Sequence, residues 1–272
     1  MPSCWPVAGS TPRSTSPRPG ATGDRGRRAD AAGDRLHRGV QLPRRGGYPA
    51  LGGRSVRWRR LFRSDAPSGL SGDDRTRFAS LGIRTVVDLR RTYEVERQGR
   101  MPDLDGVAYR HIDPGHREWH ASYRPGADPA RYFADRYLDL AEEGAHGLAE
   151  TIRVIAAEES GPVLVHCVTG KDRTGVVCAL VLALLGVPDD DIDADYALSA
   201  RANVRYAAWA RRNRQAVLPG FASPPGSVRL FLAGLRAVHG TVEAYLIGAG
   251  LGADELAALR THLLEQGRHH GI

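Results

Sequence analysis

The chain of 272 residues is 42% hydrophobic and 25% charged, which is ordinary for a globular protein with one large core or two small ones. Its net charge of +7 is concentrated at the front: residues 1–60 hold 13 Arg against three Asp, a net of +10, which leaves −3 for residues 61–272. A nucleic-acid-binding protein needs its basic surface on the folded part, so no nucleic-acid partner is expected.

The cysteine and hydropathy patterns predict a protein of a reducing, aqueous compartment. Cys4, Cys167 and Cys178 form no CxxC pair and no even-numbered framework, so a disulfide scaffold is not expected. No stretch reaches the roughly 18 apolar residues of a membrane span, and the first residues lack the apolar run of a signal peptide. We therefore predict a soluble protein without stable membrane insertion, either cytoplasmic or exported without a cleavable signal peptide.

Composition divides the chain into an N-terminal extension and one folded domain. Residues 1–40 are rich in Pro, Gly, Ser, Ala and Arg without apolar periodicity, so they bury too little surface to offset the entropy of ordering. We predict a disordered basic extension there, or alternatively an upstream extension of the functional chain. Residues 41–268 are predicted to form the domain.

Strand and helix patterns alternate along this domain. Residues 55–64 alternate like a strand. The next stretch, 71–82, is predicted to be a helix with Ser71 as N-cap, Asp74 completing a capping box and Gly82 as the end. Further strands are predicted at residues 83–90, 107–113 and 162–167. Further helices are predicted at residues 129–142, 145–159, 173–186, 188 to about 214, 227–240, 241–250 and 253–267.

This alternation indicates an α/β fold. The strand at residues 162–167, PVLVHC, is apolar on both faces, which is typical of a central strand in a parallel sheet. The helix that follows it is apolar but too short to cross a membrane, so it is expected to be buried.

The segment HCVTGKDRTG, residues 166–175, carries the chemistry. Cys167 and Arg173 are six residues apart. This separation is about 9 Å and roughly 240° on a helix, and about 20 Å on a strand. Only a loop curled between a strand and a helix brings the two side chains together, and the flanking sequence supplies both elements.

Such a loop is suited to an anion. Its backbone N–H groups point inward, and the following helix adds its unsatisfied donors and the positive end of its dipole. The guanidinium of Arg173 matches two phosphate oxygens, while Gly170 and Gly175 permit a close backbone approach. The predicted phosphate-binding residues are Val168, Thr169, Gly170, Lys171, Asp172 and Arg173.

Cys167 is the predicted nucleophile. Nearby cations and a helix N-terminus favour the thiolate, so we expect the anion at neutral pH. The thiolate attacks phosphorus in line, a phosphocysteine forms, and water hydrolyses it. This two-step reaction requires no metal and no cofactor.

Neighbouring side chains are predicted to assist. The hydroxyl of Thr174 can donate to the sulfur, and His166 can orient the loop by hydrogen bonding. Asp172 can protonate the leaving oxygen and later activate water. Asp113 is the second candidate for that role, with a turn-forming role before a proline as its alternative. Lys171, the only lysine in the chain, is predicted to be a compact cation at the mouth of the cavity.

Other polar and aromatic residues have two open interpretations. Asp88 and Arg90 either face the site or form a structural ion pair. Tyr132 and Tyr137 suit helix packing more than substrate stacking. Cys178 suits core packing, with a redox partnership with the nucleophile as the alternative.

The HCx5RT pattern resembles that of cysteine-dependent protein phosphatases. HCxxGKDRTG is more closely similar to the atypical bacterial tyrosine-protein phosphatases of the protein tyrosine phosphatase B type. Other segments resemble that family in matching order: RLFRSDAPSGL, LGIRTVVDLRRTYEVERQG, DADYALS and TVEAYL. The resemblance covers about residues 42–266. One departure is QLPRRGGY at residues 41–48, where the family usually has a motif like NFRDLGGY.

The resemblance implies a protein-tyrosine-phosphatase-like α/β fold, in which a small, mainly parallel sheet of about four strands is flanked by helices. It implies a helical C-terminal part and a helical lid, for which residues 128–144 are the equivalent, so that residues 41–268 form a phosphatase domain. It also implies that Cys167 is the nucleophile and Arg173 binds phosphate. Lys171 and Asp172 would assist, with the acid inside the loop.

The predicted function is a cysteine-dependent phosphomonoesterase, a protein tyrosine phosphatase with possible dual specificity and phosphoinositide phosphatase activity. Its predicted partners are phosphotyrosine-containing proteins or phosphoinositides. The alternative is a phosphate-recognising binding module that does not turn over. The sequence leaves the oligomeric state open.

Overall fold

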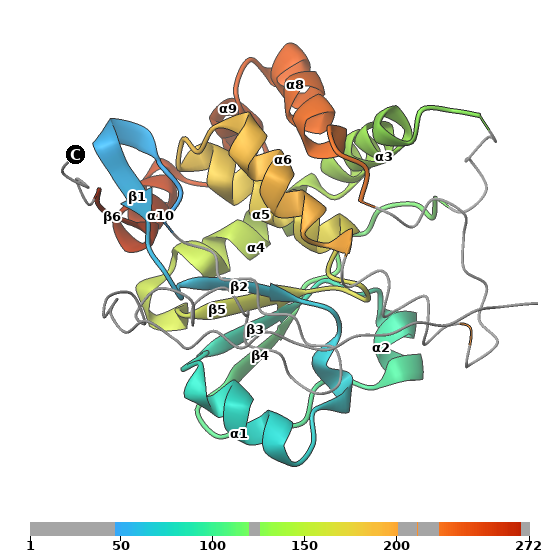
Figure 1. Cartoon of the computed structure of the whole chain (residues 1–272), viewed down its shortest axis with the longest axis vertical. Helices are drawn as coiled ribbons and strands as arrows, with labels where there is room; N and C mark the ends of the chain where they lie inside the picture. Colours follow the sequence, from blue (N-terminus) through green and yellow to red (C-terminus); the bar gives the residue numbers. More distant parts are fainter. Residues whose placement is uncertain (1–46, 120–125, 201–210, 212–222, 268–272) are drawn as a thin grey trace, which may run out of the picture. The chain divides into compact units, whose positions relative to one another are not determined.

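A four-stranded parallel sheet lies at the centre of the fold (Figure 1). Its strands follow the order β2-β5-β3-β4, and each neighbouring pair is parallel. The strands are β2 (Leu61–Ser64), β3 (Thr85–Asp88), β4 (Ala108–His111) and β5 (Val163–His166). The predicted small parallel sheet is confirmed, and β5 has the inner position that its apolar sequence predicts.

The computed structural model describes residues 47–119, 126–200, 211 and 223–267, which belong to one compact unit. The predicted extension over residues 1–40 lies outside the described residues. So does most of the predicted helical stretch beyond residue 200, up to about 214.

Helices alternate with the strands along the chain. Figure 1 shows α4 and α5 against one face of the sheet, with α3, α6, α8 and α9 beyond them and α1 on the opposite face. The helices are α1 (Asp73–Ser80), α2 (Thr92–Gln98), α3 (Pro129–Glu143), α4 (Ala145–Ala156), α5 (Asp172–Leu184), α6 (Asp189–Ala197), α8 (Ser227–His239), α9 (Val242–Gly248) and α10 (Ala253–Leu263).

A separate two-stranded sheet joins distant parts of the chain. β1 (Arg54–Val56) pairs antiparallel with β6 (Leu264–Gln266). Gly47 N–H donates to the Val56 carbonyl at 2.6 Å, and Val56 N–H donates to the Tyr48 carbonyl at 3.0 Å. Gly47 and Tyr48 are the last two residues of the segment QLPRRGGY, which departs from the family pattern. They therefore hydrogen-bond to the last residue of β1.

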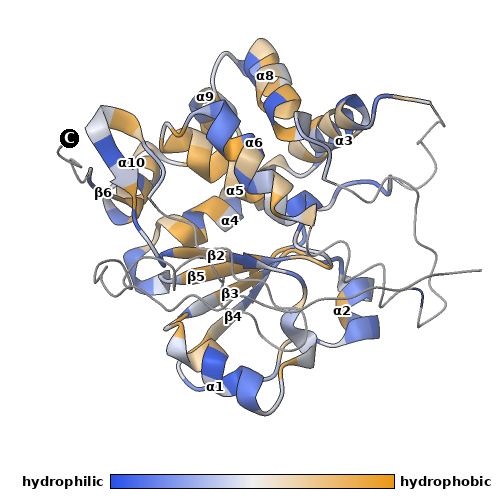
Figure 2. Ribbon diagram, viewed as in Figure 1, coloured by the Kyte–Doolittle hydropathy of each residue, from blue (hydrophilic) through white to orange (hydrophobic). Residues whose placement is uncertain are grey.

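Alternate strand residues supply two cores on the two faces of the sheet. In β5, Val163 and Val165 belong to the core on the side of α4 and α5, whereas Leu164 belongs to the core that contains Phe78 of α1. The hydrophobic residues of α5 and of the strands lie in the interior (Figure 2). Side chains buried on two faces are what a central parallel strand requires.

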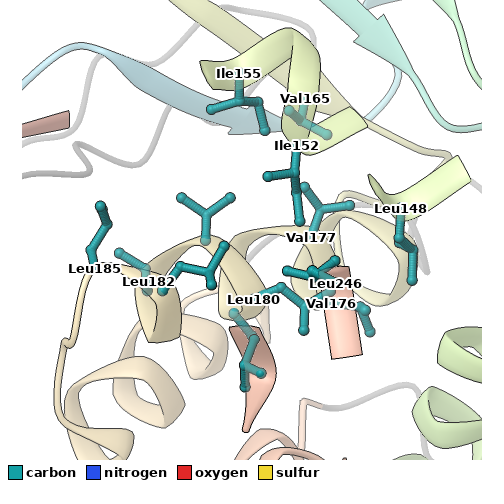
Figure 3. Close-up of a cluster of buried hydrophobic side chains, with 14 of the residues drawn as sticks. Leu148, Ile152, Ile155, Val165, Val176, Val177, Leu180, Leu182, Leu185 and Leu246 are labelled. Atoms are coloured by element: carbon teal, nitrogen blue, oxygen red, sulfur yellow. The ribbon is translucent and has the colours of Figure 1, made fainter. Parts of the chain in front are cut away.

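The core above the sheet is built around α5, which is buried along nearly its whole length. Figure 3 shows Ile152 of α4 and Val165 of β5 beside Val177 and Leu180 of α5. Burying each such side chain stabilises the fold by about 1.5–3 kcal/mol. The prediction of a buried helix after the loop is confirmed, and this core fixes the position of the helix start.

Three local predictions are wrong. The predicted helix at residues 253–267 ends at Leu263, because residues 264–266 form β6 and pair with β1. The predicted strand at residues 55–64 is divided into β1 and β2, because Arg59 adopts a positive φ of 61° and turns the chain between them. Ser71 is not the N-cap of α1: Gly72 takes that position with a φ of 52°, so the helix begins at Asp73. Glycine adopts such a positive φ at little steric cost.

Within the described ranges, no single helix is both long and apolar enough to cross a bilayer. The pair α8 and α9 passes the length and composition test only when its two helices are taken together, across a bend of 64°.

Candidate active site

The loop between β5 and α5 holds the predicted site, and its backbone is fixed by a close approach to the chain after β2. Gly170 has a φ of +68°, and a Cβ atom there would lie 2.3 Å from the carbonyl oxygen of Ser64. Ala66 N–H donates to the Val168 carbonyl at 3.1 Å. Only glycine fits at position 170, because both its conformation and the space around it exclude a side chain. Thr169 beside it is buried.

Cys167 stands at the carboxyl end of β5 and is only 2% exposed. Two cations of the same loop lie close enough to interact with it. An electrostatic interaction with Cys167 is one cause that raises the pKa of Arg173, and it also acts to raise that of Lys171. The loop therefore brings the predicted nucleophile and the predicted phosphate-binding guanidinium together.

Arg173, in the first turn of α5, is held by a carboxylate from α2. Nη1 donates to Glu94 Oε2 at 2.6 Å and to the Leu89 carbonyl at 3.0 Å, and Nη2 donates to Glu94 Oε1 at 3.0 Å. Burial alone would lower the pKa of Arg173, but the hydrogen bonds to Glu94 and the charge of Cys167 raise it well above its ordinary range. Burial alone would raise the pKa of Glu94, but Arg173 holds it below its usual value. The guanidinium is thus permanently charged and fixed in plane.

Lys171 does not lie at the mouth of a cavity, and this prediction is wrong. Its side chain is 2% exposed, and Nζ lies 3.4 Å from the ring centroid of Phe133 in α3. Burial lowers its pKa, opposed by the charges of Asp172 and Cys167. The helix predicted as a lid covers the lysine, so the cation contacts an aromatic face instead of solvent.

Asp172, the first residue of α5, is tied to the same covering helix. Tyr137 Oη donates to Asp172 Oδ1 at 2.7 Å, and Lys171 Nζ lies 3.5 Å from that oxygen. The Asp172 side chain keeps 22% of its surface exposed. A carboxyl group on the loop can donate a proton to a leaving oxygen or accept one from water.

His166 connects the loop to a buried ion pair. Its Nδ1 lies 3.1 Å from the Cys167 carbonyl, which can only accept, so Nδ1 carries the proton. Its Nε2 lies 3.6 Å from Asp88 Oδ2 and has no hydrogen-bond partner among the described residues. Burial lowers the pKa of His166 to about 4, so the ring is neutral near pH 7.

Asp88 and Arg90 form a structural ion pair beneath the loop. Both side chains are fully buried, and Arg90 donates to the carboxylate through Nε at 2.9 Å and Nη2 at 2.6 Å. Burial opposes ionisation, but the hydrogen bonds from Arg90 lower the pKa of Asp88 to about 2. Tyr109 adds a further hydrogen bond to the carboxylate at 2.8 Å. This geometry supports the structural alternative for the pair.

The neutral, buried state of His166 predicts a pH-dependent stability. The imidazole pKa falls from 6.5 to about 4 on folding, so its contribution is complete above pH 6.5 and is lost as pH falls toward 4. The contribution of His166 to the free energy of unfolding should drop by about 3 kcal/mol over this interval. Asp88, whose pKa is lowered to about 2, changes the free energy of unfolding only at pH values below this interval. Urea unfolding at about pH 7 and about pH 4.5 measures the difference.

His166→Asn should remove the His166 share of that pH dependence and leave the share of buried His116, whose pKa is also lowered to about 4. His146→Asn is the matched control, because His146 is exposed on α4 and its replacement should leave the dependence unchanged. An equal loss of stability with acid in wild type and His166→Asn would contradict the assignment.

Two other predicted site residues make no hydrogen bond to the sulfur of Cys167 among the described residues. The hydroxyl of Thr174 is buried but has no hydrogen-bond partner among the described residues, so the predicted donation to Cys167 is absent from this structure. Asp113 Oδ1 accepts the N–H of Gly115 at 2.9 Å, which is the turn-forming arrangement. Within the described ranges, Asp113 makes no hydrogen bond to the loop.

The sequence analysis did not predict the residues that support the loop through distant hydrogen bonds and ion pairs. Arg63 of β2, which is buried, donates through Nη2 to the Gly170 carbonyl and to Ser199 Oγ. Its Nη1 lies 3.7 Å from Asp195 Oδ2 of α6. The available signal was the pair of matching segments RLFRSDAPSGL and DADYALS, which contain these three residues. Glu94 was missed too, although it lies in the matching segment that begins LGIRTVVDLR.

Comparison with known sequences assigns the chain to a family. Residues 45–265 match the sequence model described as "Tyrosine phosphatase family". A protein of Cupriavidus necator, named among the tyrosine-protein phosphatases, is 33% identical over 240 residues, which cover 80% of this chain and 84% of the relative. The chain belongs to the tyrosine phosphatase family, and it is a phosphatase.

Other relatives cover less of the chain. PtpB of Mycobacterium tuberculosis, named a triple specificity protein phosphatase, is 36% identical over 166 residues, which cover 50% of this chain and 59% of PtpB. The crystal structure of TpbA from P. aeruginosa aligns with a TM-score of 0.32 at 15% identity, covering 70% of this chain and 86% of TpbA.

Proposed function

We propose that the chain is a protein tyrosine phosphatase that acts through a phosphocysteine intermediate on Cys167. The observation that carries the proposal is the loop geometry: Cys167 directly follows β5, and Arg173 lies in the first turn of α5, close enough for an electrostatic interaction between the two side chains. Glu94 holds the guanidinium there, and further N–H groups of Arg173 remain available to donate hydrogen bonds. Phosphate needs such a fixed cation and a nucleophile on the same side of it.

In the proposed reaction, the thiolate of Cys167 attacks phosphorus, the S–P bond forms and the ester P–O bond breaks. Asp172 gives its proton to the leaving oxygen. Water then attacks phosphorus while Asp172 takes the water proton, the S–P bond breaks, and inorganic phosphate leaves with the thiolate restored. Arg173, with the N–H groups of residues 168–173, stabilises the equatorial oxygens in both steps.

We further propose dual specificity and phosphoinositide hydrolysis. Support comes from PtpB, whose name describes triple specificity and which is 36% identical over 166 residues, covering 50% of this chain. The panel that tests it contains phosphotyrosine and phosphoserine peptides and vesicles with mono- to trisphosphorylated inositol lipids. Release of phosphate from phosphotyrosine alone would reduce the proposal to a strict tyrosine phosphatase.

A phosphoenzyme trap tests the mechanism. Wild-type protein mixed with p-nitrophenyl phosphate in EDTA buffer and denatured within milliseconds should carry one phosphoryl group, located on Cys167 by peptide mass spectrometry. Turnover without any phosphorylated Cys167 would overturn the covalent mechanism. Binding of phosphopeptide without release of phosphate between about pH 5 and 8 would instead favour the binding-module alternative.

A further inference from the structure

Helices α3, α5 and α6 meet at the side chain of Asp172 through a chain of hydroxyl groups. Tyr137 Oη of α3 donates to Asp172 Oδ1 at 2.7 Å. Tyr196 Oη of α6 lies 2.6 Å from Tyr137 Oη. Both tyrosine side chains are at most 1% exposed, whereas the carboxyl group that they reach is partly exposed. A buried polar chain therefore ends on a group at the edge of the site.

The number of protons fixes the direction of this chain. A phenol has one proton, and Tyr137 gives it to the carboxylate, so its oxygen accepts the proton of Tyr196. Burial, together with the negative charge of Asp172, raises the pKa of both phenols far above the ordinary value. Both residues are therefore neutral donors near pH 7.

The chain of hydroxyl groups reaches only one oxygen of the Asp172 carboxyl group. Tyr137 donates to Oδ1, and Lys171 Nζ lies 3.5 Å from the same atom. Among the described residues, no hydrogen bond to Oδ2 is present. A carboxyl group held by Oδ1 has its second oxygen available to exchange a proton with a leaving group or water.

We propose that Tyr137 is a positioning residue for Asp172: its hydroxyl anchors Oδ1 and leaves Oδ2 as the oxygen that exchanges protons with substrate and water. This inference rests on the proposed function and on Asp172 as the acid and base. Helix α3 would then contribute to the chemistry through Tyr137 as well as cover the loop.

Packing alone accounts for the ring of Tyr137 but not for its hydroxyl. The ring has edge contacts with Tyr196 and Phe231, at centroid separations of 6.0 and 6.1 Å. A phenylalanine would keep these contacts. The hydroxyl adds only the two hydrogen bonds, and one of them is to the carboxyl group on the loop.

The test is Tyr137→Phe assayed on a series of aryl phosphates with leaving groups of rising pKa. p-Nitrophenolate leaves with little need for a proton, so kcat/KM for p-nitrophenyl phosphate should change by less than about threefold. Phenol, with a pKa of about 10, needs a proton, so kcat/KM for phenyl phosphate should fall about tenfold.

Tyr245→Phe is the matched control. Tyr245 of α9 is also a buried tyrosine bonded to α3, with its hydroxyl donating to the Ala141 carbonyl at 2.6 Å, but it has no contact with the loop among the described residues. Its replacement removes the same atoms and one hydrogen bond to the same helix. The dependence on the leaving group should stay that of wild type.

Asp172→Asn and the double variant Tyr137→Phe/Asp172→Asn distinguish the role of Asp172 as acid and base from the role of Tyr137 in positioning it. If Tyr137 acts through Asp172, its replacement has no further effect on phenyl phosphate in the Asp172→Asn background. Equal losses on both aryl phosphates in Tyr137→Phe, or an additional tenfold loss in the double variant, would overturn the positioning role. If Asp172→Asn alone retains full activity on phenyl phosphate, the acid assignment in the proposed function fails and this inference fails with it.

Discussion

Replacing Cys167 with serine should lower kcat for p-nitrophenyl phosphate by about 10,000-fold or more, because a protonated hydroxyl replaces the attacking sulfur anion. The loop should remain intact, since serine is smaller than cysteine and the position of Gly170 is fixed by Ser64 and Arg63. Stopped-flow and steady-state assays measure the loss. Calorimetric titration with inorganic phosphate should give an affinity close to that of wild type, because the Arg173 contacts do not depend on the sulfur.

Cys178→Ser controls for loss of a buried thiol. Cys178 lies within α5 and is 1% exposed, so its hydroxyl variant should lower stability while kcat of the folded protein stays near that of wild type. Residual turnover in Cys167→Ser above about a hundredth of the wild-type rate would exclude this cysteine as the nucleophile.

The parts that sequence predicted well are those set by local pattern. The loop from Cys167 to Arg173 was predicted because only a strand-to-helix turn brings these residues together, and the apolar stretches on each side are local signals. β5 and α5 were found for the same reason. The four-stranded sheet followed from the resemblance, whose segments are themselves short and local.

The residues that support the loop could not be found from local pattern, because their partners are distant in sequence. Arg63 and Gly170 are separated by 107 residues, and Tyr137 and Asp172 by 35. Arg63 and Tyr137 have no sequence spacing that marks a contact with the loop. The misplacement of Lys171 has the same origin: a lysine on a phosphate loop suggests an exposed cation until the covering helix α3 is known to place Phe133 over it.

Arg173→Lys should lower kcat/KM for p-nitrophenyl phosphate about 1,000-fold, even though the charge is kept. In the wild type, Glu94 and the Leu89 carbonyl take both Nη1–H groups and one Nη2–H. The Nε–H and the second Nη2–H make no hydrogen bond to described residues, so one edge of the planar fork is left for two phosphate oxygens. An ammonium group has a single nitrogen and cannot bind Glu94 and both oxygens in this geometry.

The loss should appear in kcat as well as in KM, since charge spreads over the equatorial oxygens most strongly in the transition state. A thousandfold change corresponds to about 4 kcal/mol of transition-state stabilisation. Arg236→Lys is the matched control: Arg236 of α8 makes a bidentate pair with Asp189, at 2.6 and 2.9 Å, and takes no part in the loop. It should keep wild-type kinetics. A lysine variant at position 173 that stays within about tenfold of wild type would mean that charge alone suffices and that the fork held by Glu94 is not what binds the phosphoryl group.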